Sequence, residues 1–461
     1  MKHIIIGRGM QFLVGLLTYR VLTNALSPEE FGTYGIIITI AGFYSLIFIN
    51  PIGIYINRKI NEWNKQGIIE NNFNDYAKYI LIIAVLTYPI SVVMLQILRI
   101  DNIFILSVIL SIYLISNTFN QTVIPSLNLL GKDKYYAYCT MGTAIFALVN
   151  SIILTTIDNI AINWLIGIIV SQVIFGVIGY AYLVREQIKK IIKIDHKYRL
   201  QVFKYAWPLL LTSLFLWFQL QGYKFIVVSY YGIKEFGLLI ASYGVAAVLM
   251  AAGEQILQNI FQPKCYREIS NKNCWSNYAN SMIASIILYA TIIFISIEII
   301  SQIFLSADYR NNLNVIRVAI ICEALRVING IFSYKDTLDH TTKNLIYPNF
   351  IAAIILIPSI SILINFYSIE IIWIPIILTI GQLITLYLLA VKNRSINLNN
   401  RINLNKISKI LIFNGLIIFI NQIIKYNIYN EYLSTTINMI SCTIVIYVAF
   451  KLNIIKIKDY I

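Results

Sequence analysis

The stretch Ile160–Leu183, IAINWLIGIIVSQVIFGVIGYAYL, contains no charged residue along its whole length. A helix needs about 20 mainly apolar residues to cross a hydrocarbon core of about 30 Å, so this stretch is long enough to span a membrane. Stretches of the same kind follow one another in both directions from it. Their approximate limits are 4–24, 34–57, 78–98, 103–127, 136–157, 160–183, 203–229, 235–262, 279–304, 313–334, 346–366, 369–391, 408–425 and 432–451.

The composition of the 461-residue chain excludes most other classes of protein. Hydrophobic residues make up 58% of the chain and charged residues 12%, whereas an ordinary soluble domain has about 45–50% and about 25%. Too few polar side chains are available to cover the surface of a soluble enzyme, and a disordered or fibrous chain is excluded as well. The sequence therefore predicts an all-α, polytopic membrane protein with about 14 transmembrane helices.

Three kinds of chemical site lack their usual sequence signals. The five Cys and three His are scattered without the spacing of a disulfide framework or a metal site. A nucleophile with its base and orienting group cannot be assembled from these histidines. The Gly-x-x-x-x-Gly-Lys-Ser/Thr pattern of a nucleotide-binding loop is absent. We therefore expect no catalytic residues, no metal and no cofactor.

The distribution of charge orients the chain in the membrane. If the N-terminus is cytoplasmic, most of the 36 Lys and Arg residues fall in inside segments, and the outside segments carry only Arg99, Lys234, Arg310 and Lys425. This asymmetry is typical of the positive-inside rule and predicts that both termini are cytoplasmic. The formal net charge of +15 is thereby explained by topology, and no nucleic acid is expected as a partner.

Two hydrophilic segments, at about 184–204 and 392–409, divide the predicted spans into groups of six, six and two. A repeated tripeptide supports this division, because Glu30-Phe31-Gly32 follows the first span and Glu235-Phe236-Gly237 follows the seventh. Parallel repeats of this kind occur in transporters, with the substrate pathway between the halves. The expected organisation is an N-terminal six-helix lobe (1–200), a C-terminal six-helix lobe (201–391) and two additional transmembrane helices (392–461).

Ionisable residues inside predicted spans are candidates for function, because each costs at least about 2.5–3.5 kcal/mol at mid-helix and usually faces an internal cavity. Five of them are basic, which suits an anionic substrate such as a phosphate group. The candidate substrate-binding residues are Arg8, Arg20, Lys224, Arg317 and Arg326. Two alternatives stay open. Arg8 can extend to lipid headgroups, and Glu323 can neutralise Arg326 three positions away on the same helix.

Uncharged polar residues recur along single faces of several predicted spans. The candidates for a polar lumen are Asn57, Asn117, Gln121 and Gln258. One interpretation is a passage lined for sugars. The other is hydrogen bonding between helices, which contributes about 0.6 kcal/mol on average inside membranes.

The segment Leu22–Gly35, LTNALSPEEFGTYG, together with Gly9-Met10-Gln11-Phe12 and Pro51-Ile52-Gly53, resembles the start of Wzx-type O-antigen flippases. These belong to the multidrug/oligosaccharidyl-lipid/polysaccharide exporter superfamily. The resemblance implies transport of an undecaprenyl-pyrophosphate-linked oligosaccharide across the bacterial inner (plasma) membrane by alternating access. The cargo would be a repeat unit of the O-antigen of lipopolysaccharide, or of a capsule or other exopolysaccharide.

The same resemblance implies roles for residues and partners. A cationic cavity would hold the pyrophosphate or acidic sugars, and Arg20, Lys224 and the arginines of the tenth span match its basic residues. Coupling to an ion gradient is expected for such exporters, and Glu254 and Glu323 are the candidates. The implied partners are the lipid-linked oligosaccharide, membrane lipids, a glycan polymerase and a chain-length regulator.

Two other functions stay open at this point. An ion-coupled multidrug or small-molecule antiporter has the same fold, although it usually has an acid-lined site for cations. A polytopic polysaccharide polymerase typically carries a large outer loop with basic catalytic residues, whereas the predicted outer loops here are short. We therefore expect a transporter and not an enzyme.

Overall fold

The computed structural model describes residues 2–185, 207, 210–267, 274–338, 342–367, 369–396, 404–426, 438 and 440–445. All the regular secondary structure in these ranges is helical. The chain divides into two compact units, Met1–Ile240 and Ala241–Ile461, with the boundary inside one long helix. The lobe boundaries expected from the sequence at residues 200 and 391 stay predictions.

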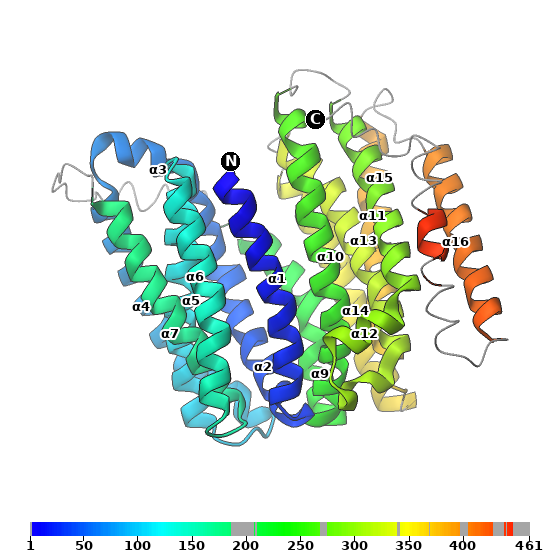
Figure 1. Cartoon of the computed structure of the whole chain (residues 1–461), viewed down its shortest axis with the longest axis horizontal. Coiled ribbons are helices and arrows are strands. Elements are labelled where there is room, and N and C mark those ends of the chain that lie inside the picture. Colours follow the sequence, from blue (N-terminus) through cyan, green and yellow to red (C-terminus); the bar gives the residue numbers. More distant parts are fainter. Residues whose placement is uncertain are drawn as a thin grey trace. The chain divides into compact units, whose positions relative to one another are not determined.

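The first unit contains seven long α-helices and two short π-helical segments in its described part (Figure 1). Its elements are α1 (Lys2–Ala25), α2 (Pro28–Tyr44), η1 (Ser45–Ile49, π-helical), α3 (Asn50–Gln66), α4 (Ile69–Ile97), α5 (Ile103–Leu129), α6 (Asp133–Thr155), α7 (Ala161–Val184), η2 (Phe218–Gly222, π-helical), α9 (Tyr223–Tyr231) and the start of α10 (Ile233–Arg267). Within this unit, α7 packs against α5 and α6, and α1 packs against α6.

The second unit continues α10 and adds further helices. They are α11 (Cys274–Ile295), α12 (Ile297–Phe304), η3 (Ala307–Asn312, a 3-10 helix), α13 (Leu313–Leu338), η4 (Thr342–Leu345, a 3-10 helix), α14 (Ile346–Tyr367), α15 (Trp373–Ile396) and α16 (Leu404–Tyr426). Here α13 packs against α11 and α15, and α11 also contacts α16. The side chain of Asn329 ties α13 to α15, because its amide donates to the carbonyl oxygen and the side-chain oxygen of Gln382 at 3.0 and 2.8 Å.

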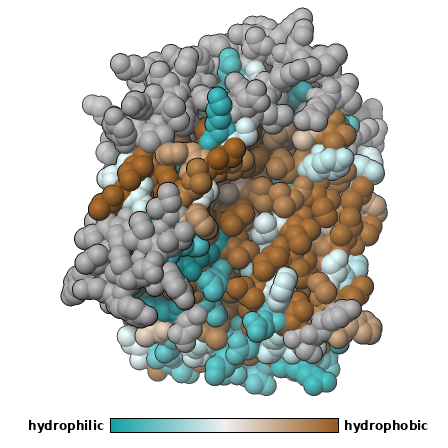
Figure 2. Space-filling view, turned by 90° about the vertical axis from the view of Figure 1, so that its right-hand side faces the viewer, coloured by the Kyte–Doolittle hydropathy of each residue, from teal (hydrophilic) through white to brown (hydrophobic). Residues whose placement is uncertain are grey.

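Nine helical segments of the described residues are long and apolar enough to cross a membrane. Large apolar side chains on them point outward, such as Val85, which is 71% exposed, and Val177, which is 58% exposed. On the face seen in Figure 2, apolar residues cover the middle and hydrophilic residues gather at the lower edge. Such a band is suited to lipid. The predicted all-α, multi-pass membrane fold is confirmed.

The predicted spans coincide with described helices, except the last, 432–451, which lies mostly outside the described residues. Hydropathy alone did not reveal three interruptions in the described helices. The second predicted span passes through the π-helical η1 before Pro51, the seventh passes through the π-helical η2, and the ninth is divided at Ser296 into α11 and α12. A proline at the start of a helix is compatible with its missing N–H, because the first N–H groups have no partner inside the helix.

The start of α2 follows directly from the sequence Ser27-Pro28-Glu29-Glu30. The Ser27 hydroxyl caps the helix by accepting from the Glu30 N–H at 3.3 Å. Proline suits the first helical position, and the two carboxylates complement the positive end of the helix dipole. Glu30 also accepts a hydrogen bond from the Ala161 N–H at 2.7 Å, which ties the start of α2 to the start of α7.

The two copies of the repeated Glu-Phe-Gly tripeptide meet inside the first unit. A Cβ atom added at Gly237 would collide with the carbonyl oxygen of Pro28, and one added at Gly32 would collide with that of Ile233. Phe31 and Phe236 are buried beside this contact. We call this close approach of α2 and the first turns of α10 the glycine crossing. Only a residue without a Cβ fits at Gly32 and Gly237 with the two backbones at this separation.

Candidate functional site

The main group of charged side chains in the second unit joins α10 to α13. The guanidinium of Arg326 lies between two carboxylates: its Nε is 2.6 Å from Glu323 Oε2, and its Nη2 is 3.0 Å from Glu254 Oε2. Glu323 is buried, and the other two side chains are half-buried. Hydrogen bonds between charged groups at these distances are among the stronger ones in proteins.

Two neutral side chains hold the carboxylates in place. The Tyr243 hydroxyl donates to Glu323 Oε1 at 3.0 Å, and the Gln258 amide donates to Glu254 Oε1 at 3.0 Å. Each carboxylate therefore receives one bond from Arg326 and one from a neutral donor. We call Tyr243, Glu254, Gln258, Glu323 and Arg326 the ion cluster.

Helical spacing explains why these residues can meet. At 100° per residue, Tyr243 and Glu254 are eleven positions apart and lie within about 20° of each other around α10, and Gln258 follows one turn later. Glu323 and Arg326 are three positions apart on α13 and also share a face. Packing of α10 against α13 then brings the two sets of side chains into contact.

The ion cluster carries one negative charge in excess, because two carboxylates face one guanidinium. Arg326 is therefore charge-compensated by its neighbours. The local pairing of Glu323 with Arg326 that the sequence left open is present, and Glu254 joins it. An arrangement with a net negative charge can accept a proton or another monovalent cation.

The second arginine of α13, Arg317, lies in a different environment. Its guanidinium is 3.2 Å from Glu298 Oε1 on α12 and donates to Asn314 Oδ1 at 2.9 Å. It lies nine positions before Arg326, which corresponds to about 13 Å along the helix. The structure therefore pairs Arg317, in the first turns of α13, with the Glu298 carboxylate of α12, and this pair is separate from the ion cluster.

The basic candidates of the first unit lie on α1 and α9. Lys224 is half-buried, and its ammonium group is 3.3 Å from Thr39 Oγ1 on α2. Arg20 is half-buried on α1. The side chain of Arg8 lies outside the described residues.

The four candidates for a polar lumen fall into different surroundings. Gln258 belongs to the ion cluster. Asn117 accepts from the amide of the buried Gln172 at 3.1 Å, so it joins α5 to α7 within the first unit. Asn57 and Gln121 are exposed.

Sequence reasoning missed two polar residues that organise these contacts. Tyr243 could have been found from its helical register with Glu254, but tyrosine is so common in this chain that it gave no signal. Gln172 lies at the centre of a network in which Ser116 donates to its Oε1 at 2.9 Å and Asn120 donates to its carbonyl oxygen at 3.2 Å. One of its partners on α5, Asn117, is a residue that the sequence did single out.

Comparison with known proteins gives a family and a fold. The sequence profile of a family described as polysaccharide biosynthesis protein matches residues 21–273, more than half of the chain. Among the curated proteins, no relative matches.

Three solved structures illustrate the likeness. The lipid II flippase MurJ in an inward closed conformation has a TM-score of 0.72 at 13% identity, with 98% of this chain and 100% of that chain covered. An inward-facing multidrug resistance MATE family transporter of the MOP superfamily has a TM-score of 0.63 at 11% identity, with 87% and 95% covered. A MOP superfamily transporter from Pyrococcus furiosus, described as having a binding pocket of reverse polarity, has a TM-score of 0.56 at 12% identity, with 85% and 93% covered.

At these identities the solved structures show the fold alone, and it is the fold of transporters and flippases, not of catalytic enzymes. The family match covers the segment that resembles Wzx-type flippases, so that resemblance is confirmed. The chain belongs to the polysaccharide biosynthesis protein family and has the fold of the multidrug/oligosaccharidyl-lipid/polysaccharide exporter superfamily.

Proposed function

We propose that this protein is a flippase that carries an undecaprenyl-pyrophosphate-linked oligosaccharide across the bacterial plasma membrane by alternating access. The observation that carries the proposal is the match of residues 21–273 to the polysaccharide biosynthesis family. The likeness in fold to a lipid II flippase over 98% of the chain also supports a lipid-linked cargo. The cargo is a repeat unit of the O-antigen of lipopolysaccharide or of a related surface polysaccharide.

Basic groups of the first unit are the proposed contacts for the anionic part of the cargo. The Lys224 ammonium lies 3.3 Å from the Thr39 hydroxyl and can act as a point charge for phosphate, and Arg20 supplies a planar fork that fits phosphate oxygens. Arg8 is proposed to help at the cytoplasmic end. Arg317 and Arg326 carry less of the substrate charge, because Glu298 and the ion cluster already balance them.

The ion cluster is the proposed coupling site. Its excess negative charge favours uptake of a proton or monovalent cation at Glu254 or Glu323. Ion binding would weaken the hold of that carboxylate on Arg326 and so change the packing of α10 against α13. Such a change in packing is what coupling requires, because an ion shifts the equilibrium between two conformations only if it binds one of them more tightly than the other.

An ion-coupled multidrug antiporter of the same fold is the second candidate function. The acidic excess of the ion cluster favours cation coupling in either case. The family match favours the lipid-linked glycan as cargo.

The topology and the partners are also part of the proposal. By the positive-inside rule we place both termini in the cytoplasm. We expect a glycan polymerase and a chain-length regulator to act on the exported units.

The test is deletion of the gene, followed by extraction of polyprenyl-linked lipids and electrophoresis of the surface polysaccharide. The proposal predicts loss of polymeric surface glycan, accumulation of single lipid-linked repeat units, and rescue by the intact gene. Normal polymer in a strain without a redundant exporter would reject the glycan as cargo and favour the antiporter.

Replacing Tyr243 with Phe is expected to lower export several-fold while the protein stays folded. The change removes one hydrogen bond to the Glu323 carboxylate, and a bond to a charged group contributes about 1.5–3 kcal/mol when fully formed. The export rate in the complemented deletion strain measures the effect. Tyr138→Phe on the exposed surface of α6 is the control and should export normally. Equal export by both variants would show that Tyr243 does not position Glu323.

A further inference from the structure

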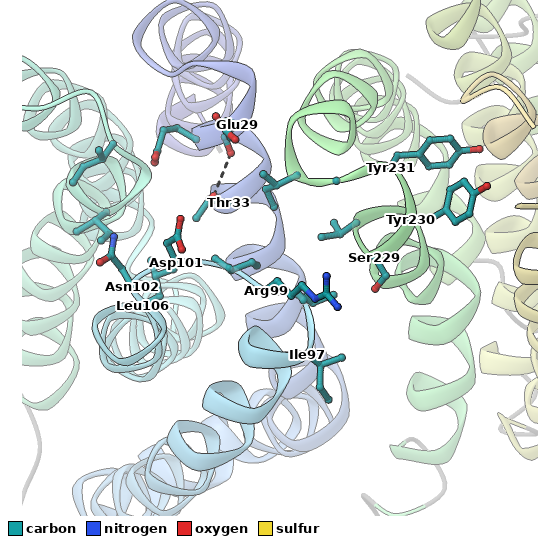
Figure 3. Close-up of a pocket in the computed structure, with 18 residues that line it drawn as sticks. Glu29, Thr33, Ile97, Arg99, Asp101, Asn102, Leu106, Ser229, Tyr230 and Tyr231 are labelled. Carbon is teal, nitrogen blue, oxygen red and sulfur yellow. Dashed lines mark hydrogen bonds between the residues drawn. The ribbon is translucent and has the colours of Figure 1, made fainter. Parts of the chain in front are cut away.

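A cavity of about 920 Å³ opens at one end of the first unit, where several helices begin or end (Figure 3). Its walls come from the first turns of α2, the connection between α4 and α5, the start of α7, and the connection between α9 and α10. By the distribution of charge, this end of the helices faces the outer side of the membrane. The mechanism proposed above does not use it.

Several polar side chains that line the cavity are not engaged by the rest of the described structure. Among the described residues, none forms a hydrogen bond or ion pair with the side chains of Glu29, Arg99, Asp101 or Asn102. Figure 3 shows Glu29, Thr33 and Asp101 on one side of the opening and Ser229 on the other. The side chains of Glu29, Arg99, Asp101 and Asn102 are available to a ligand. The hydroxyls of Thr33 and Ser229 already donate to backbone carbonyl oxygens, and the Glu30 carboxylate accepts from the Ala161 N–H.

The loop that carries three of these side chains has an unusual backbone. Arg99 and Asn102 have φ angles of 54° and 56°, in the left-handed region that residues other than glycine seldom adopt. Tight hydrogen bonds from the Arg99 and Ile100 N–H groups to the end of α4, at 3.1 Å each, hold this turn. Asp101 is therefore presented at a fixed place on the rim of the cavity.

The free groups suit polyhydroxylated ligands. Two carboxylates and an amide oxygen accept from hydroxyl groups, and the guanidinium of Arg99 and the amide of Asn102 donate to them. Apolar side chains between them, among them Ile97, Leu106 and Ile162, can cover the C–H faces of a sugar ring. With two free carboxylates against one guanidinium, the cavity disfavours phosphate groups and acidic sugars.

We infer that this outer cavity binds neutral sugar residues of the exported glycan after they reach the outer side. The inference rests on the proposed function and adds a second contact zone with the opposite charge preference. Basic groups in the spans would hold the pyrophosphate, and the outer cavity would hold the sugars. A site that takes up the sugars and repels the pyrophosphate would favour forward movement of the cargo.

Binding to the purified full-length protein in detergent tests the inference. The probe is the repeat-unit saccharide released by mild acid from the lipid-linked units of the deletion strain, and saturation-transfer NMR reports its binding. Asp101→Leu should weaken binding about tenfold, as expected for loss of a charged acceptor. Asp158→Leu is the matched control, because Asp158 is an exposed acid of a nearby connection that does not line the cavity. It should bind like the wild type.

Three results would overturn the inference: equal binding by the wild type and Asp101→Leu, equal weakening by Asp158→Leu, or displacement of the saccharide by inorganic pyrophosphate. Thermal unfolding of each variant shows whether it is folded. If lipid-linked units accumulate in the deletion strain but Asp101→Leu binds normally, only the outer cavity is rejected. If no such units accumulate, the proposed function fails, and the sugar site fails with it.

Discussion

Replacing Arg326 with Gln is expected to reduce export at least tenfold and to lower the thermal unfolding temperature by several degrees. The change leaves Glu254 and Glu323 facing each other without the guanidinium that separates them. Breaking a fully buried ion pair costs about 3–5 kcal/mol. Because Arg326 and Glu254 are half-buried, solvent will reduce that cost, but a loss of about 1.4 kcal/mol already corresponds to tenfold.

A double variant and a control variant separate the electrostatic effect of Arg326→Gln from its other effects. Arg326→Gln combined with Glu323→Gln returns the cluster to one negative charge, so it should recover much of the lost stability without recovering coupling. Lys59→Gln is the control, because its 2.6 Å ion pair with Glu62 is exposed and such pairs contribute only about 0–1 kcal/mol. Export by Arg326→Gln at the wild-type rate would contradict the role of the ion cluster.

The helices of this fold could be predicted from the sequence because membrane spans have a simple physical signal. A run of apolar residues of sufficient length leaves a helix as the stable choice in lipid. Hydropathy does not report local backbone changes, so the π-helical segments at 45–49 and 218–222 and the break at Ser296 appeared only in the structure. All three occur inside predicted spans.

The candidate site was predictable where it depends on one helix and unpredictable where it depends on two. The spacing of Glu323 and Arg326 made their pairing one of the alternatives open from the sequence, since residues three apart share a helical face. The contact of Arg326 with Glu254, 72 positions earlier, depends on how α10 packs against α13, and no local pattern encodes that packing. The partner of Arg317 is a further example, because Glu298 belongs to another helix.

The repeated tripeptide shows the same limit in another form. The sequence identified Glu30-Phe31-Gly32 and Glu235-Phe236-Gly237 as related segments, but comparison of segments says nothing about whether they touch. In the structure they form the glycine crossing, where each glycine faces a backbone carbonyl near the other. The glycines are therefore required by packing, and their recurrence in both copies reflects one shared contact.

Replacing Gly237 with Ala is expected to abolish most export, because the new methyl group would overlap the carbonyl oxygen of Pro28. A backbone atom cannot swing away as a flexible side chain can, so α2 and α10 must move apart. Helix propensity alone predicts the opposite effect, because alanine is more favourable than glycine inside a helix by about 1 kcal/mol. A loss of export would therefore report the collision between the helices. The measurement is export in the complemented deletion strain, together with the thermal unfolding of the purified variant.

Gly53→Ala on α3 is the matched control, because an added Cβ there meets nothing within 4 Å. It should export normally and unfold at the same or a slightly higher temperature. Gly32→Ala should resemble Gly237→Ala, and the double variant should be little worse than either, because one methyl group already separates the helices at the shared contact. Fully additive losses would show that the two glycines act independently, and normal export by Gly237→Ala would show that the glycine crossing need not be tight.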